Sequence, residues 1–319
     1  MTHVRHTLDS DAERAHHELR SQVAGFAPMP FRPPESCQVV LDGRRFHYLD
    51  WGEGTRDVVL FLHGGGQTAR TWDAICHDVT SDGRRRAIAL DQRGHGDSEW
   101  SYEFDYGPDA HARDIGSLLD HLELERVAIV GMSMGCINGL RFALDHPHRV
   151  SSFTAVDAGP WINTEASGAI VDFVQGTQEL ESFEAYVERA MAFNPRRHPV
   201  LLERSLRHNL RELPNGRWTW KTDWRRPAEF VENVKRAVLA LQQEVPQLTC
   251  PLLVTRGAES QIFLDSHAEH FAANVPNGTW RRIEGAGHAI QGDQPHALAK
   301  ILEDFWLGDV RQGRTLSNT

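Results

Sequence analysis

Residues 127–140 read VAIVGMSMGCINGL, and this stretch carries the strongest indication of the architecture. The apolar run at its start predicts a buried strand, and the sequence after Gly135 can continue as a helix. Between them stands G-x-S-x-G, with Ser133 at the sharp turn from strand to helix. Such a turn strains the serine, so the flanking positions need glycine to avoid Cβ clashes. The exposed hydroxyl then lies at a helix N-terminus, where an oxyanion is stabilised. We therefore predict that Ser133 is a nucleophile.

Apolar strands and helical segments alternate on both sides of this turn. Strands are predicted at 37–41, 45–51, 58–62, 87–90, 127–130, 153–156, 252–255 and 279–283, and helices between them at 70–80, 109–122, 265–274 and 295–305. The alternation indicates an α/β fold with a mostly parallel eight-stranded sheet and helices on both faces.

The alternation is interrupted once. Residues 161–245 read as helices without strands between them, at 182–193, 199–212 and 227–243, and are predicted to form an inserted helical cap. The α/β core would then comprise 37–160 and 246–307. A polar arm is expected over 1–36, with a short helix from about Asp11, and a loose tail over 308–319.

The composition limits the class of protein. With 319 residues and 40% hydrophobic content, the chain can form one large domain with an insertion or two small domains. A net charge of −10 argues against nucleic acid or anionic membranes as partners. The 4 cysteines are scattered and form no CxxC pair, which favours a reduced protein over a disulfide framework or a zinc site. The N-terminus lacks a signal-peptide pattern, so a soluble, cytoplasmic protein is expected.

A serine hydroxyl needs a base, and His288 is the predicted one. It follows the last predicted strand within a glycine-rich loop at 284–288. A histidine at the carboxyl edge of a parallel sheet can reach a serine on the fifth strand. His63 and His95 lie near the same edge, where we interpret them as residues that shape turns.

The carboxylate that would orient this base stays open. Its usual place is the loop after the seventh strand, but Ser260 and Gln261 stand where an aspartate is expected there. Asp157, at the end of the strand after the elbow, is the first candidate, and Glu259 and Asp265 are alternatives. A structural turn before Gly159 is the competing interpretation of Asp157, and water in place of a carboxylate also remains open.

Two backbone N–H groups are expected to form an oxyanion hole. One belongs to Met134, directly after the nucleophile, and the other to the glycine run after the third strand. Gly65 is the predicted donor, with Gly66 second. The lack of Gly-Lys-Ser/Thr after these glycines argues against a phosphate-binding loop. The segment 91–98 is interpreted as a rigid turn that supports the floor of the site.

The predicted cap is rich in aromatic residues. Asn215-Gly216 suggests a hairpin that places Trp218 and Trp220 on one face. Together with Gly66 and Trp161, these two indoles are predicted to line an apolar pocket for a medium-sized or aromatic group.

These motifs together resemble the α/β-hydrolase family over roughly residues 37–307. The resemblance rests on His63-Gly64-Gly65-Gly66, the segment 91–98, the elbow at 131–135 and Gly285-Ala286-Gly287-His288, in the family's order. Within the family the chain resembles capped bacterial serine ester hydrolases, particularly an actinobacterial branch that shares Gly64 to Trp72. The resemblance implies Ser133 as nucleophile, His288 as base, and Gly65 and Met134 as oxyanion donors. It leaves the acid open.

The leading hypothesis is a serine hydrolase that cleaves carboxylic esters or lactones, with no cofactor and no metal. Its partner would be a small-molecule ester or lactone, and the oligomeric state is open. Carbon–carbon bond hydrolases resemble this elbow but usually carry a Trp after the catalytic His, where Ala289 stands. A cofactor-free oxygenase and a non-catalytic ligand-binding protein are the remaining alternatives.

Overall fold

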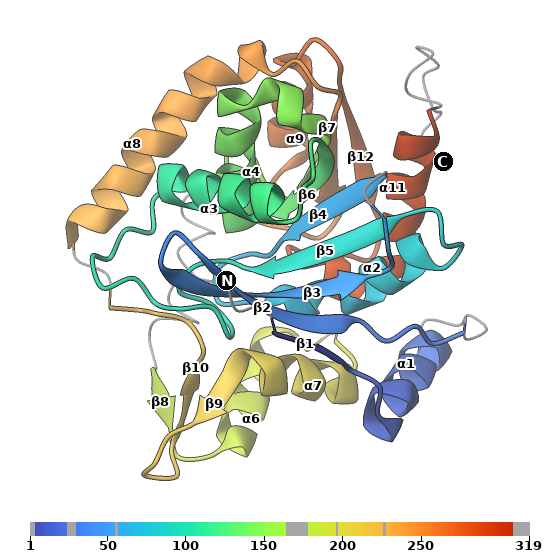
Figure 1. Cartoon of the computed structure of the whole chain (residues 1–319), viewed down its shortest axis with the longest axis vertical. Helices are drawn as coiled ribbons and strands as arrows, with labels where there is room; N and C mark the ends of the chain where they lie inside the picture. The colour runs from blue at the N-terminus through green and yellow to red at the C-terminus, as the bar shows by residue number, and fades with distance from the viewer. Residues whose placement is uncertain are drawn as a thin grey trace.

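The computed structural model of the protein describes residues 4–23, 30–54, 57–163, 178–195, 197–225 and 228–308. A single large sheet runs through the molecule with helices on both faces (Figure 1). The predicted tail over 308–319 lies outside the described residues from 309 onward. Within the described residues, no helix combines the length and apolar character needed to cross a membrane.

The sheet has nine strands in the order β1-β2-β3-β5-β4-β6-β7-β11-β12. The strands are β1 (Val4–Thr7), β2 (Glu35–Leu41), β3 (Arg44–Trp51), β4 (Val58–Leu62), β5 (Arg86–Asp91), β6 (Val127–Met132), β7 (Val150–Val156), β11 (Leu252–Gly257) and β12 (Gly278–Ile283). From β5 to β12 all neighbours are parallel, while β1, β2 and β3 pair antiparallel.

The ninth strand, β1, corrects the prediction of eight strands. It belongs to the N-terminal arm and pairs with β2 from Val4↔Gln38 to Thr7↔Glu35. All its residues are exposed, and it joins the sheet through backbone hydrogen bonds and an exposed ion pair between Arg5 and Glu35 at 3.4 Å. A strand of this kind has no alternation of apolar and polar residues for sequence reasoning to detect.

Helices cover both faces of the sheet and build two apolar layers. The helices are α1 (Asp11–Val23), α2 (Asp73–Thr80), α3 (Pro108–His121), α4 (Met134–Asp145), α6 (Phe183–Phe193), α7 (Pro199–Asn209), α8 (Ala228–Glu244), α9 (Asp265–Ala273), α10 (Ile290–Asp293) and α11 (Pro295–Leu307), with 3₁₀ turns η1 (Ala69–Trp72), η2 (Pro147–Arg149) and η3 (Val245–Gln247). One layer contains residues of α3, α4, α8 and α9, and the other those of α2 and α11. All four cysteines are buried and free.

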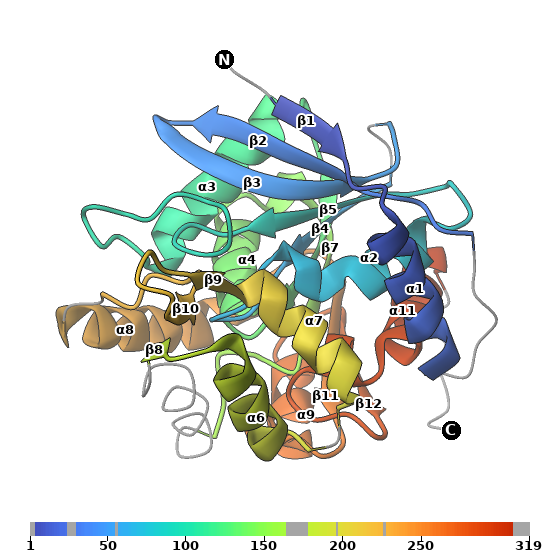
Figure 2. The ribbon, with the colours of Figure 1, turned by 90° about the horizontal axis from the view of Figure 1, so that it is seen from below.

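The segment between β7 and β11 forms a cap with its own small core. Besides α6, α7 and α8 it contains a three-stranded sheet of β8 (Glu179–Leu180), β10 (Trp218–Trp220) and β9 (Leu210–Glu212). The predicted hairpin at Asn215-Gly216 accounts for the pairing of β9 with β10, whereas β8 was not predicted. The helix predicted over 199–212 ends at Asn209. Residues 210–212 instead form β9, which pairs with β10 across the predicted hairpin. Figure 2 shows α6 and α7 beside this sheet. Trp218 and Trp220 both pack against α6, through Phe183 and Tyr186 respectively.

Helix α1 ties the cap to the core. The Glu13 carboxylate accepts hydrogen bonds from Arg70 in η1, at 2.7 Å, and from Arg204 in α7. Burial opposes the ionisation of Glu13, but the two arginines outweigh it and lower its pKa. The N-terminal arm, predicted to be polar with a short helix from about Asp11, contains that helix as α1 and also the strand β1.

Candidate active site

The turn from β6 to α4 holds Ser133 in a strained conformation, with φ of +50° and ψ of −116°. Its carbonyl accepts the N–H groups of Cys136 and Ile137, which starts the helix. A Cβ at Gly135 would overlap the Leu62 carbonyl, and one at Gly131 would lie 2.6 Å from the Gly135 oxygen. The glycines of the motif are therefore required because the turn packs against neighbouring backbone.

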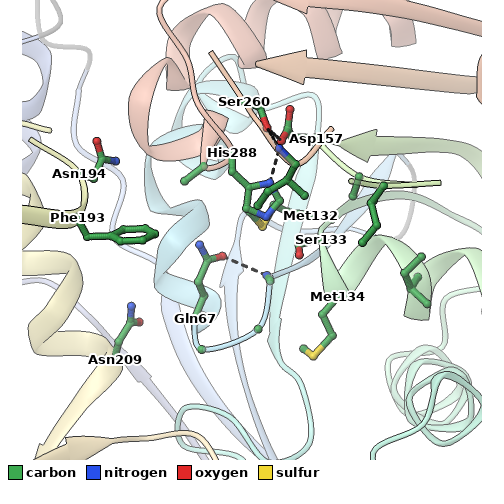
Figure 3. A pocket seen from close by; sticks show the side chains of 18 of the residues that line it. Gln67, Met132, Ser133, Met134, Asp157, Phe193, Asn194, Asn209, Ser260 and His288 are labelled. Atoms are coloured by element: carbon green, nitrogen blue, oxygen red, sulfur yellow. Dashed lines mark hydrogen bonds and ion pairs between the residues drawn. The ribbon is translucent and has the colours of Figure 1, made fainter. Parts of the chain in front are cut away.

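His288 and Asp157 meet across the carboxyl edge of the sheet. Asp157 follows β7, has a φ of +48° and is fully buried. His288 lies in the loop after β12, and its Nδ1 is 2.8 Å from Oδ2 of Asp157. Figure 3 shows the imidazole between this carboxylate and Ser133. The structure thus brings together the predicted nucleophile, base and first candidate acid.

The last residue of β11 and the loop after it supply donors to Asp157. The Ser260 hydroxyl donates to Oδ2 at 2.6 Å, and the backbone N–H of Gly257 donates to Oδ1 at 2.8 Å. Of the alternative acids, Asp265 instead pairs with Arg256 and Arg282 at the start of α9. The side chain of Glu259 is exposed and lines the cavity. The geometry favours Asp157 as the partner of the base.

His63 holds the start of the glycine loop after β4 through both of its ring nitrogens. Nε2 of His63 accepts the backbone N–H of Gln92 at 3.0 Å, so Nδ1 carries the proton and donates to the Gly64 carbonyl at 2.8 Å. Burial lowers the pKa of His63, which agrees with a neutral ring. His63 therefore shapes the turn, as the sequence indicated.

Gln67 fixes the start of this loop and is a residue that sequence reasoning missed. Its Oε1 accepts the Gly64 N–H at 3.1 Å (Figure 3). This bond occupies the backbone N–H of Gly64, so the N–H of Gly65 is the next one along the chain that can donate to a ligand. A Cβ at Gly65 would meet nothing within 4 Å, so the loop faces open space there. The sequence feature that could have indicated this role is the position of Gln67, directly after the glycine run.

The segment 91–98 forms the supported turn that the sequence predicted. The buried Asp91 carboxylate accepts bonds from the Ala69 and Asp97 amides, at 2.6 and 2.9 Å, and contacts His47 at 2.7 Å. Burial opposes its ionisation, but His47 outweighs this effect and keeps the pKa of Asp91 well below its ordinary value. Although His47, Asp91 and Asp97 lie close together, Nε2 of His47 is bonded to Ser36 and no ring nitrogen is left for a metal ion.

A cavity of about 710 Å³ opens in front of Ser133 and His288, between the core and the cap. Met134, Gly65, Gly66 and Trp220 line it as predicted. Most other lining side chains are apolar, among them Ile137, Ile162, Phe193, Leu202, Leu206, Trp224, Phe230, Val234 and Val238.

Two of the predicted pocket residues do not line this cavity, and the prediction was wrong for them. Trp161 packs edge-on against His270, with ring centroids 4.6 Å apart, and joins the core layer of α9. Trp218 packs on Phe183, with centroids 5.1 Å apart, inside the cap. Both indoles contribute to packing. Trp224, which was not predicted to line the pocket, does line the cavity.

Asp293 connects the loop of His288 to the cap. Its Oδ2 accepts the Gly287 N–H at 2.9 Å, directly before His288, and its Oδ1 lies 3.2 Å from Nε of Arg197. A Cβ at Gly292 would overlap the Arg197 guanidinium, so this glycine provides the space in which the arginine lies. No sequence motif indicated this pair, because its members are 96 residues apart.

Comparisons with known proteins identify the fold family. The profile of the alpha/beta hydrolase fold family matches residues 57–295. The chain is 32% identical over 264 residues to the esterase Rv0045c of Mycobacterium tuberculosis, an alignment that covers 80% of this chain and 84% of the relative. A crystal structure of that esterase superposes with a TM-score of 0.73 and 30% identity, covering 94% of this chain and 99% of the other.

A more distant relative is the 2-hydroxy-6-oxononadienedioate/2-hydroxy-6-oxononatrienedioate hydrolase of Comamonas testosteroni. It is 26% identical over 279 residues, which cover 83% of this chain and 92% of the relative. The strand order, the serine elbow and these matches lead to one conclusion. The chain belongs to the α/β-hydrolase family, and within it is similar to a bacterial esterase.

Proposed function

We propose that this protein is a serine hydrolase that cleaves carboxylic esters or lactones through an acyl-enzyme on Ser133. One observation carries the proposal: His288 contacts the buried Asp157 carboxylate at 2.8 Å, in the cavity that also holds Ser133 on a strained elbow. An acceptor on Nδ1 fixes the tautomer in which Nε2 is the basic nitrogen.

In the first half of the reaction, Nε2 of His288 takes the proton of Ser133 as Oγ attacks the ester carbonyl carbon. The carboxylate of Asp157 stabilises the imidazolium that forms. His288 then protonates the leaving alcohol oxygen as the C–O bond breaks. In the second half, water attacks the acyl-enzyme with His288 as base and releases the carboxylic acid.

The developing oxyanion would be held by the backbone N–H groups of Met134 and Gly65. Met134 is the first residue of α4, so its amide has no acceptor within the helix, and the residue lines the cavity. The Gly64 amide is occupied by Gln67, which supports the choice of Gly65. Removal of one such donor typically costs about 10²-fold or more in kcat.

The cavity volume and its apolar lining support a medium-sized or aromatic acyl or alcohol group. The experiment that tests the function is labelling of the purified protein with a fluorophosphonate, read by peptide mass mapping, beside a series of p-nitrophenyl esters. We expect stoichiometric labelling at Ser133 that Ser133→Ala and His288→Ala abolish. No labelling and no turnover would contradict the proposal and favour a ligand-binding protein. Activity that falls steadily beyond acetate would contradict the proposed pocket.

A second candidate is the hydrolysis of a carbon–carbon bond in a diketone-type substrate. The relative from Comamonas testosteroni and a 2-hydroxy-6-oxo-6-phenylhexa-2,4-dienoate hydrolase of the same organism, also 26% identical, support keeping it. Product analysis separates the two reactions. Hydrolysis of an ester gives an alcohol and a carboxylic acid, whereas hydrolysis of the carbon–carbon bond beside a ketone gives a carboxylic acid and a second product with a new C–H bond.

A further inference from the structure

Five carboxamide side chains line the cavity, those of Gln67, Asn138, Asn194, Asn209 and Gln261. Asn138 is buried and donates to Gln92 at 2.8 Å, and Gln261 is exposed. The other three, Gln67, Asn194 and Asn209, come from the glycine loop, the end of α6 and the end of α7. In the view of Figure 3, Asn194 and Asn209 lie on the cap side, and Gln67 lies nearer Ser133. We call these three residues the carboxamide strip.

Two members of the strip have their oxygens engaged by the protein. Oε1 of Gln67 accepts the Gly64 N–H at 3.1 Å and lies 3.4 Å from the Gln291 amide nitrogen. Because a backbone N–H can only donate, the oxygen of Gln67 must face Gly64. Oδ1 of Asn209 accepts the Thr68 hydroxyl at 3.2 Å. The NH₂ groups of Gln67 and Asn209 are therefore the ends left to donate to a ligand.

The third member offers the opposite chemistry. Oδ1 of Asn194 is buried and has no hydrogen-bond partner among the described residues. A buried acceptor without a donor costs free energy, and a ligand that supplies an N–H or O–H recovers it. The strip thus offers two donor groups and one acceptor that needs a donor.

Two of the charged residues that line the cavity, Arg197 and Asp293, are matched to each other, while Glu259 is exposed in the loop after β11. Arg197 and Asp293 line the same cavity and form an ion pair at 3.2 Å, and Oδ2 of Asp293 also accepts the Gly287 N–H. Neither charge is left without a counterpart for an ionic substrate group. The strip therefore favours an uncharged ligand group that has a hydrogen-bond donor and a hydrogen-bond acceptor on neighbouring atoms.

We propose that the carboxamide strip binds an uncharged secondary amide in the substrate, a deepening that rests on the proposed ester hydrolysis. The substrate N–H donates to Oδ1 of Asn194, and the substrate carbonyl accepts from the NH₂ of Gln67 or Asn209. The apolar wall takes the hydrocarbon part. The substrate class is thus an ester or lactone that carries an amide a few bonds from the scissile carbonyl.

The test compares two p-nitrophenyl esters of the same shape. In 4-acetamidobutanoate the amide is present, and in 6-methylheptanoate a CH₂ and a CH₃ replace its N–H and carbonyl oxygen. After subtraction of spontaneous hydrolysis, we expect wild-type kcat/KM to favour the amide ester by about tenfold, because the hydrocarbon leaves the strip unpaired. A wild-type preference for the hydrocarbon ester, or none, overturns the inference and leaves ester hydrolysis standing.

Asn194→Leu is the sharpest variant, because Oδ1 of Asn194 has no hydrogen bond among the described residues to lose. We expect it to lower kcat/KM for the amide ester about tenfold and to raise that for the hydrocarbon ester. Asn277→Leu makes the same change at an exposed position outside the cavity lining, and should keep the wild-type ratio. If Asn194→Leu keeps that ratio too while it unfolds at the wild-type temperature, the strip does not bind the amide.

A binding measurement separates this inference from the proposed function. Ser133→Ala cannot form the acyl-enzyme, so the affinity of both esters can be read from the fluorescence of Trp220 and Trp224, which line the cavity. Tighter binding of the amide ester by about tenfold supports the strip even if the wild type hydrolyses neither ester, an outcome that would contradict only the proposed reaction. Equal affinities overturn the strip whatever the turnover.

Discussion

The imidazole of His288 contacts the carboxylate of Asp157 at 2.8 Å, although 131 residues separate them in the sequence. The same carboxylate accepts the Ser260 hydroxyl at 2.6 Å and the Gly257 amide at 2.8 Å. The acid thus comes from the strand next to the elbow, and the loop after β11 contributes a hydroxyl donor. Three donors leave the carboxylate little freedom to rotate, so the ring of His288 is held in one orientation.

The first prediction concerns the acid. Asp157→Asn should lower kcat for a p-nitrophenyl ester by about 10⁴-fold, because the amide favours the wrong imidazole tautomer and does not stabilise the imidazolium. The measurement is steady-state hydrolysis beside a circular dichroism spectrum. Asp265→Asn is the control and should change kcat by less than about twofold, since its partners Arg256 and Arg282 lie outside the cavity lining. A comparable loss in Glu259→Gln would assign the acid to Glu259.

The elbow and the α/β alternation could be predicted because they are local patterns. The apolar run before Gly131 and the G-x-S-x-G spacing report a buried strand and a close backbone approach, and both depend on neighbouring residues alone. The cap helices were found for the same reason. In contrast, β1 joins the sheet through its backbone, and exposed side chains such as those of Val4 and His6 carry no signal of that pairing.

The acid and the pocket wall depend on contacts between distant segments. Asp157, Glu259 and Asp265 all follow strands at one edge of the sheet, and only the side-chain geometry distinguishes them. Likewise, Trp218 and Trp220 were correctly placed on one face of a hairpin, yet one indole packs on Phe183 and the other reaches the cavity. Spacing gives the face of a strand but not what lies opposite it.

The second prediction contrasts two glycines. Gly135→Ala should destabilise the protein by about 3 kcal/mol or more, because its Cβ would overlap the Leu62 carbonyl, which belongs to a rigid central strand. Gly65→Ala should change the free energy of unfolding by less than about 0.5 kcal/mol, since a Cβ there meets nothing within 4 Å. Urea unfolding measures both. Equal destabilisation by the two changes would contradict the packing at the elbow.

The third prediction concerns the contact between Asp293 and the loop of His288. Asp293→Ala should lower kcat about tenfold, because the Gly287 amide loses its acceptor and the loop loosens. Asp293→Asn should lower it less, since an amide oxygen still accepts from Gly287. If kcat is equal in the two variants, the hydrogen bond to Gly287 does not position His288.

The ion pair of Asp293 with the cap can be tested separately. Arg197→Met leaves the Asp293 carboxylate, with 7% of its side chain exposed, without its counterion, and should reduce stability by about 3 kcal/mol. Arg113→Met removes an exposed pair with Asp105 and should cost less than about 1 kcal/mol. Thermal unfolding of the two variants gives the comparison. Similar losses would show that the Arg197 pair behaves as a surface pair.

The last prediction concerns pH and a buried histidine of the cap. His208 in α7 has a buried Nε2 with no partner among the described residues. Burial, reinforced by Arg70, Arg204 and Lys221, lowers its pKa to about 2. Between this value and the ordinary 6.5, the unfolded chain binds a proton that the folded protein does not, so stability falls as the pH drops below 6.5.

One such group contributes about 1.4 kcal/mol per pH unit, or about 2 kcal/mol between pH 6.5 and about pH 5. His208→Leu should therefore remove about that much of the acid-induced loss, measured by urea unfolding at the two pH values. His148→Leu replaces an exposed histidine and should keep the wild-type slope. An unchanged slope in His208→Leu would mean that the folded protein already binds this proton. Arg70, Arg204 and Lys221 make that protonated ring unfavourable, because like charges repel.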